Sequence, residues 1–177
     1  MKYFKNNFLN VPVYNKPQDY IKISEEMAAI HSLCFKNSKH HLSQKSMYYY
    51  LKETKTHVFY NKISIAIIQV TDFEADLITI GVNPNNQGKG IGSKLLELIS
   101  LYLKDLKVNN LFLEVDSNNN TAIKIYSNIG FKACGIRKNY YQKCNGIQSD
   151  ASVMVYNVSR KNGKLDKKKL QRLYPTG

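Results

Sequence analysis

The chain has 177 residues, and its 26 basic and 13 acidic side chains give a formal net charge of +13. This length favours one domain that needs no metal or disulfide to fold, and a composition of 43% hydrophobic and 22% charged residues excludes a disordered chain. The longest apolar runs are only a few residues and the start lacks the apolar segment of a secretory signal, so we expect a cytoplasmic protein with no membrane contact.

The first part of the chain is expected to contain two helices. Asp19–Ile23 is interpreted as a short strand that precedes them. Ser24 is a candidate N-cap for a helix over Glu25–Phe35, in which apolar residues recur at helical spacing. Ser43 is a candidate cap for a second helix, which is expected to end at Lys52.

An antiparallel meander is expected next. Three strands are predicted over 56–60, 63–70 and 76–82, and Asn61-Lys62 between the first two is typical of a two-residue hairpin turn.

The second half alternates between helical and strand patterns. A helix over Ser93–Leu106 has an apolar face of period 3.6. The elements expected after it are a strand over Leu111–Val115, a helix over Thr121–Asn128 that is capped by Asn119 or Asn120 and stops at Gly130, strands over Phe131–Arg137 and Ala151–Val158, and a long loop over Tyr140–Asp150. This order predicts an α/β or α+β fold.

A glycine-rich loop over Gln87–Gly92 lies between a predicted strand and a predicted helix. The first amides of a helix are unpaired and the helix dipole adds positive charge, so the loop is a candidate pyrophosphate cradle. Its spacing fits neither a Walker loop nor a dinucleotide fingerprint. The alternative is a glycine turn that only reverses the chain.

Glu114 is a single acid on an apolar strand. Strand alternation places Leu111, Leu113 and Val115 on one face, with Phe112 and Glu114 on the other. The alternative to a functional role for Glu114 is an ion-paired carboxylate. The three scattered cysteines have no CxxC pair and are expected to be free thiols, and the four histidines show no metal-binding spacing, so no metal is expected.

The ordered motifs resemble the GNAT superfamily of acetyl-CoA-dependent N-acetyltransferases. The loop matches the family's Q/R-x-x-G-x-G/A pattern, and the series continues through Leu113-Glu114-Val115, Asn119, Tyr126, Gly130-Phe131 and Gly135 to Tyr141. The series looks like the RimI-type bacterial ribosomal-protein-alanine N-acetyltransferases. The resemblance implies an α+β fold with a mixed, mostly antiparallel sheet of six to seven strands and about four helices, which splays between its fourth and fifth strands.

The resemblance also implies a site and a cosubstrate. Acetyl-CoA would lie in the splay, contacted by Ile80, Gly81, Val82, Gln87, Gly88, Lys89, Gly90, Ile91, Gly92, Ser93 and Asn119. Glu114 would be the general base and Tyr126 would protonate the leaving sulfur; the alternative for Tyr126 is an aromatic ring that only packs. The region 35–43 and the loop over Tyr140–Asp150 would wall the acceptor groove.

The acceptor and the role of the basic end of the chain stay open. A protein N-terminal α-amine, with a ribosomal protein as one candidate, is weighed against lysine, polyamine or another small amine, and against an inactive RNA-binding module. We expect residues 1–158 to form the acetyltransferase domain, poorly defined over 1–18. Residues 159–177 form a tail with seven basic side chains and one acidic, which could contact RNA or the ribosome weakly or be merely solvated.

Overall fold

The computed structural model describes residues 17–36, 41–142, 146 and 148–159. Four α-helices and six strands are found in this part of the chain, together with a short 3₁₀ turn over Pro84–Asn86. The elements are α1 (Pro17–Cys34), α2 (Gln44–Lys52), β1 (Thr56–Asn61), β2 (Ser64–Thr71), β3 (Glu74–Val82), α3 (Ile91–Asp105), β4 (Asn110–Asp116), α4 (Asn120–Ile129), β5 (Lys132–Gln142) and β6 (Gln148–Asn157).

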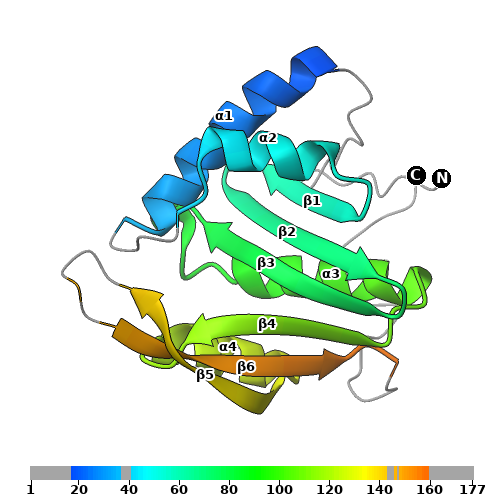
Figure 1. Ribbon diagram of the computed structural model, residues 1–177, viewed down its shortest axis with the longest axis vertical. Coiled ribbons are helices and arrows are strands. Elements are labelled where there is room, and N and C mark those ends of the chain that lie inside the picture. Colours follow the sequence, from blue (N-terminus) through cyan, green and yellow to red (C-terminus); the bar gives the residue numbers. More distant parts are fainter. Residues whose placement is uncertain (1–16, 37–40, 143–145, 147, 160–177) are drawn as a thin grey trace.

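The six strands form one sheet in the order β1-β2-β3-β4-β6-β5 (Figure 1). Only β3 and β4 run parallel, and they pair from Glu74↔Asn110 to Leu77↔Leu113. Beyond Leu77, β3 continues to Val82 without β4 beside it, and the two strands diverge. The expected mixed sheet is therefore confirmed, and the splay lies between the predicted strands 76–82 and 111–115, which are the third and fourth strands described and not the fourth and fifth, because Asp19–Ile23 is helical.

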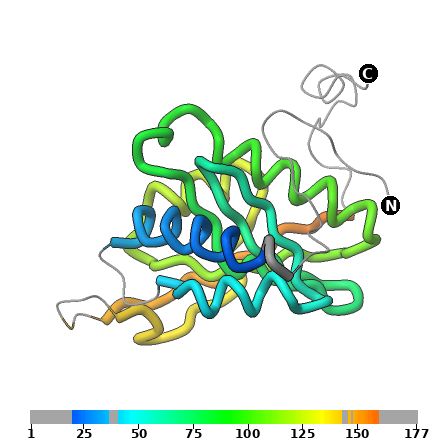
Figure 2. The backbone as a smooth tube through the Cα atoms, turned by 90° about the horizontal axis from the view of Figure 1, so that it is seen from above, coloured from blue at the N-terminus to red at the C-terminus, as the bar shows by residue number. Residues whose placement is uncertain are grey.

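Helices cover both faces of the sheet, and two apolar cores result. One core joins α3 and α4 to one face, with Leu96, Ile99 and Leu113 among its buried members. The other joins α1 and α2 to the opposite face at the β1–β3 end, around Met27 and Met47. Figure 2 shows α1 and α2 on one side of the sheet and α3 on the other.

A β-bulge in β3 changes which helix its side chains meet. Ile68 pairs with Leu77 but Ile67 pairs with Thr79, so Ile78 has no partner on β2. Before the bulge Leu77 packs in the α3 core. After it, Thr79 contacts His31 on α1. One extra residue thus turns the end of β3 toward α1.

The strand expected over Asp19–Ile23 is wrong, because these residues belong to α1. Ser24 is not an N-cap either: it lies in the middle of the helix, where its hydroxyl donates to the carbonyl of Ile21. Ile23 and Met27 are buried at a spacing of four, whereas Ile21 is 54% exposed. The helix therefore begins before Glu25, where the sequence analysis placed its start, and the alternation of polar and apolar residues over Asp19–Ile23 does not indicate a strand.

Several element boundaries were predicted well. Ser43 caps α2 as expected, and α4 is capped by Asn119 and ends at Gly130. The hairpin turn is shifted by one residue, since Asn61 pairs with Ser64 and the turn is Lys62-Ile63. The Asn61 side chain accepts hydrogen bonds from the amides of residues 63 and 64, which fixes that register.

The long loop expected over Tyr140–Asp150 is largely wrong, because β5 continues to Gln142 and β6 already begins at Gln148. Tyr141 pairs with Ser149 in this added part of the hairpin. The expectations for residues 1–16, for the tail from 160 to 177 and for Cys144 lie outside the described residues. No described helix is long and apolar enough to cross a membrane.

Candidate active site

The glycine loop is tied back to the end of β3. Gln87 donates from its side-chain amide to the carbonyl of Val82 at 2.9 Å. The Asn83 side chain accepts from the amide of Asn85, and the Asn83 amide donates to the carbonyl of Ile63 at the β1–β2 turn. Gln87 therefore holds the loop in shape. This structural role was not predicted from the sequence, which indicated only a contact with the cofactor.

Gly88 and Gly90 give the loop its open surface. Their φ angles are +76° and +73°, which glycine adopts at little cost, and no described atom lies within 4 Å of a Cβ built on either residue. Gly90 is the N-cap of α3, and Lys94 donates the first helical hydrogen bond back to it. The amides of Ile91, Gly92 and Ser93 precede that bond and have no acceptor within the helix.

This arrangement fits a diphosphate. Anions are stabilised where free amides and the positive end of a helix dipole coincide, and α3 is a 15-residue helix. Lys89 is exposed beside these amides and adds a cation. The loop thus offers a suitable cradle for the pyrophosphate of a coenzyme.

The last residues of β3 line the gap between the two diverging strands. Ile80, Gly81 and Val82 pair with β2 on one side, while the pairing of β3 with β4 ends at Leu77. Their other backbone groups can therefore bond an extended ligand that continues from the loop.

Helix α1 supports this end of β3 closely. A Cβ on Gly81 would lie 2.9 Å from the sulfur of Cys34, so glycine is needed for the close approach of the helix. The Cys34 thiol also donates to the carbonyl of Val82 at 3.2 Å, and burial raises the pKa of this thiol.

His31 links the same helix to β3 through a buried contact. Its Nδ1 accepts from the amide of Leu42, so Nε2 carries the proton and donates to the hydroxyl of Thr79 at 3.0 Å. Its ring stacks on Phe35 with centroids 4.3 Å apart. Burial, together with the charge of His41, lowers the pKa of His31 to about 4, so the ring is neutral near pH 7.

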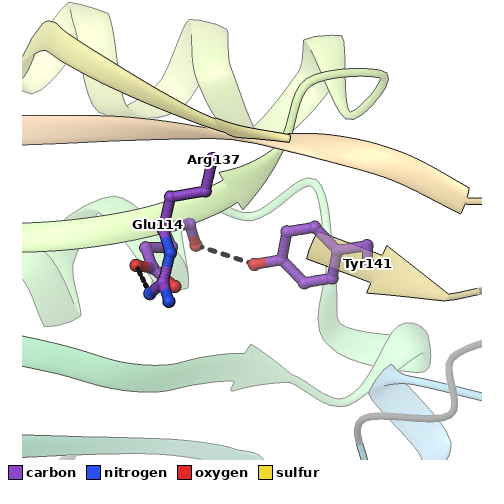
Figure 3. A network of polar contacts seen from close by, with 3 residues as sticks. All are labelled: Glu114, Arg137 and Tyr141. Carbon is purple, nitrogen blue, oxygen red and sulfur yellow. Dashed lines mark hydrogen bonds and ion pairs between the residues drawn. The ribbon is translucent and has the colours of Figure 1, made fainter. Parts of the chain in front are cut away.

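Glu114 lies on β4 just past its last pairing with β3. The buried residues Leu113 and Val115 face the α3 core, so the Glu114 side chain lies on the opposite face of the sheet. One carboxylate oxygen accepts from Nη1 of Arg137 at 2.5 Å, and the backbone carbonyl accepts from the hydroxyl of Tyr141 at 3.0 Å (Figure 3). Glu114 thus has the ion pair that the alternative interpretation predicted.

A second carboxylate, Asp76, is close to Glu114. Asp76 is opposite Phe112 in the parallel pairing and projects from the face opposite to Ala75 and Leu77, which is the face of Glu114. Burial, Glu114 and Glu74 together raise the pKa of Asp76. The sequence interpretation missed this residue.

Tyr126 lies on α4. It packs against the α3 core, with its ring 5.7 Å from that of Phe131. Burial raises the pKa of Tyr126 to about 12, so its hydroxyl keeps its proton at neutral pH. Burial also raises the pKa of Tyr141. The nearby groups Tyr140, Glu114 and Tyr126 raise that pKa further. Tyr141 thus donates a hydrogen bond to Glu114 and also feels the Tyr126 hydroxyl electrostatically.

Asn119 has a structural task in the described chain. Its side-chain oxygen accepts from the amide of Ala122 at 3.1 Å and caps α4. Two N–H groups of its amide remain as donors. The described residues contain no group of three or more His, Cys, Asp or Glu side chains arranged to hold a metal ion.

The structure places the glycine loop with the end of β3 on one side of the splay and Glu114 on the other, while Tyr126 packs on α4 against the α3 core. It adds Arg137, Asp76 and His31, which sequence reasoning missed. Arg137 falls within the recognised motif between Gly135 and Tyr141, but its contact with Glu114 spans 23 residues and no spacing rule indicates it.

Comparisons with known proteins agree with this geometry. The sequence profile described as "Acetyltransferase (GNAT) family" matches residues 24–131. A [ribosomal protein bS18]-alanine N-acetyltransferase of Haemophilus ducreyi is 33% identical over 138 residues, which are 78% of this chain and 93% of the relative. The Escherichia coli protein of the same name is 40% identical over 96 residues, 54% of this chain and 64% of the relative.

A solved structure is similar as well. The crystal structure of the ribosomal-protein-S18-alanine N-acetyltransferase from Escherichia coli superimposes with a TM-score of 0.66 at 30% identity. The match covers 80% of this chain and 93% of that one.

Proposed function

Because the chain belongs to the acetyltransferase (GNAT) family, we propose that this N-acetyltransferase modifies the N-terminal α-amine of a protein, and of a ribosomal protein in particular. The acceptor is suggested by relatives that are named for an alanine of ribosomal protein bS18. The observation that carries the proposal is the diverging pair β3 and β4, with the glycine loop and the free N-terminal amides of α3 on one side of the gap and Glu114, just past the last β3–β4 pair, on the other.

The loop and the end of β3 bind the cosubstrate in this proposal. The amides from Gly88 to Ser93 hold the pyrophosphate of acetyl-CoA, and the backbone of Ile80, Gly81 and Val82 holds the arm that leads to the thioester. Asn119 contributes its free amide N–H groups from the α4 side. Acetyl-CoA supplies an activated acetyl group and a thiolate leaving group.

Two side chains move protons. Glu114 accepts the proton that the acceptor amine loses as its nitrogen bonds to the acetyl carbon, directly or through water. Tyr126 donates its hydroxyl proton to the sulfur as the carbon–sulfur bond breaks. The pKa of Tyr126, raised by burial to about 12, supports this assignment because the hydroxyl is protonated before each turnover.

An α-amine suits this machinery better than a lysine side chain. The ordinary pKa of an α-amine is near 8 and that of lysine is about 10.4. A larger fraction of the α-amine is therefore neutral near pH 7, and less help is needed from the base.

Coenzyme A release measured with a panel of amines tests the proposal. Peptides that begin with Ala or Ser are compared with the same peptides acetylated at the N-terminus and carrying one internal lysine, and with a polyamine. We expect release with the free α-amine and an acetylated N-terminus in the mass spectrum. Release with lysine or polyamine alone would contradict the assignment of the acceptor.

The proposal also covers the whole chain and its location. We assign the transferase domain to residues 1–158 and a separate basic tail to 159–177, and place the protein in the cytoplasm, where acetyl-CoA and ribosomal proteins are available. Truncation after residue 158 should leave peptide acetylation unchanged and weaken any retention on RNA. If truncation abolishes acetylation, the tail belongs to the catalytic domain.

A further inference from the structure

Another bulge, the second of two in the β5–β6 hairpin, brings three side chains to Glu114. The register shifts between Arg137 and Tyr141, and Asn139 within it has a φ of +52°. Asp150 on β6 fixes this bulge, because one of its oxygens accepts from the amide of Asn139 at 3.0 Å and the other from Nζ of Lys138 at 2.7 Å. These hydrogen bonds lower the pKa of Asp150, so the anion that holds the bulge is stable.

Arg137 is held between an anion and an aromatic ring. Its Nη1 donates to the Glu114 carboxylate, and its guanidinium carbon lies 4.4 Å from the centroid of the Tyr140 ring. The hydrogen bond to Glu114 raises the pKa of Arg137. A hydrogen bond with Glu114 likewise raises the pKa of Tyr140. The carboxylate therefore receives donors from Arg137 and Tyr140, while Tyr141 holds its backbone.

Among the residues that the structure describes, the other groups beside Glu114 do not balance its charge. Asp76 on β3 is a second acid on the same face, and Glu114 contributes to its raised pKa. Val153 on β6, directly opposite Glu114, is apolar. Tyr126 on α4 and Tyr141 on β5 are phenols whose pKa values are raised, so they are uncharged near pH 7. Without a cation, two neighbouring carboxylates would favour protonation of one of them.

We propose that Arg137 is a positioning residue for Glu114: its ion pair with the carboxylate, braced by the Tyr140 ring, fixes the direction of the carboxylate so that it can accept the proton of the acceptor amine. The inference rests on the proposed function and adds a residue to it. The Arg137 side chain is 56% exposed, and exposed ion pairs contribute little to stability. The loss of Arg137 should therefore appear in turnover rather than in the free energy of unfolding.

The first test measures kcat/KM with an Ala-starting peptide together with the free energy of unfolding. In Arg137→Gln we expect kcat/KM to fall by at least about tenfold, because the carboxylate loses the contact that holds its direction, while the free energy of unfolding stays unchanged. Arg137→Lys should recover part of the lost rate. Lys132→Gln, which removes an exposed cation from the start of the same strand, should cause no loss. A wild-type rate in Arg137→Gln overturns the proposal.

The second test combines the two changes and measures kcat/KM with the same peptide. Arg137→Gln combined with Glu114→Gln should cost no more than Glu114→Gln alone, because both changes act through one group. Losses that multiply in the double variant overturn the proposal. If the wild-type chain acetylates no peptide, the proposed acceptor fails, and the same comparison with the amine that it does acetylate still decides the role of Arg137.

Discussion

The two sides of the gap between β3 and β4 are built in different ways. On the loop side the contacts that set the shape are short-range, such as Gln87 with Val82, and α1 buttresses the strand from behind. On the Glu114 side the contacts join three strands, since Arg137 and Tyr141 reach β4 from β5 across β6. The first side is a rigid backbone cradle and the second is a network of side chains. Changes to them should therefore separate binding of acetyl-CoA from turnover.

The largest expected effect is on turnover, in Glu114→Gln. Loss of a positioned base costs about 10²–10⁴-fold in rate, while the amides of the loop are untouched and acetyl-CoA should bind with unchanged affinity in calorimetry. Glu74→Gln is the matched control, because it removes an exposed carboxylate from the adjacent strand β3. A Glu114→Gln enzyme with the wild-type rate would place the base elsewhere, with Asp76 the next residue to change.

Tyr126→Phe should lower kcat by about 10²-fold, the lower end of the range for acid–base groups. Because the pKa of Tyr126 is about 12, its hydroxyl should contribute no alkaline limb to the pH profile below about pH 11. Tyr102→Phe is a suitable control, since that hydroxyl contacts His57 away from the gap. Equal rates in the two variants would show that Tyr126 only packs.

On the buttressed side, His31 should make stability depend on pH. In the unfolded chain His31 has its ordinary pKa of about 6.5, whereas in the folded chain its pKa is about 4. The stability that the fold gains by burying a neutral His31 is therefore fully present above pH 6.5 and is lost as the pH falls toward 4. Between pH 6.5 and 5 the free energy of unfolding should fall by about 2 kcal/mol.

Urea denaturation at several pH values measures this effect. His31→Gln should be less stable at pH 7 and should lose most of the pH dependence between 6.5 and 5. A variant with the wild-type slope would assign that slope to other groups.

Gly81→Ala should have the smallest effect, a loss of about 1 kcal/mol from the free energy of unfolding. The new methyl group would lie 2.9 Å from the Cys34 sulfur, and α1 would have to move away from β3. The double variant with Cys34→Ala should recover part of the loss, which thermal melts can follow. Strictly additive losses would show that the two residues do not compete for space.

The elements that the sequence predicted well are those with local signals. Ser43 and Asn119 cap their helices through hydrogen bonds to residues three positions on, and the glycine loop combines a strand end, glycines and a helix start within one segment. The start of α1 was missed because Asp19–Ile23 is too short to distinguish a strand from a helix without its buried neighbours. The Glu114 network was missed because it depends on how β5 is bulged against β6.

The unpaired Ile78 has a consequence for anyone who redesigns this chain. Deleting Ile78 would move every later residue of β3 to the other face of the sheet. Thr79 would then lose its contact with His31, and Gly81 would no longer lie against Cys34. The strand therefore cannot be shortened by one residue without changing its contacts, because the number of residues between Leu77 and Thr79 decides which face of the sheet the later side chains occupy. Counting residues along this strand matters as much as choosing them.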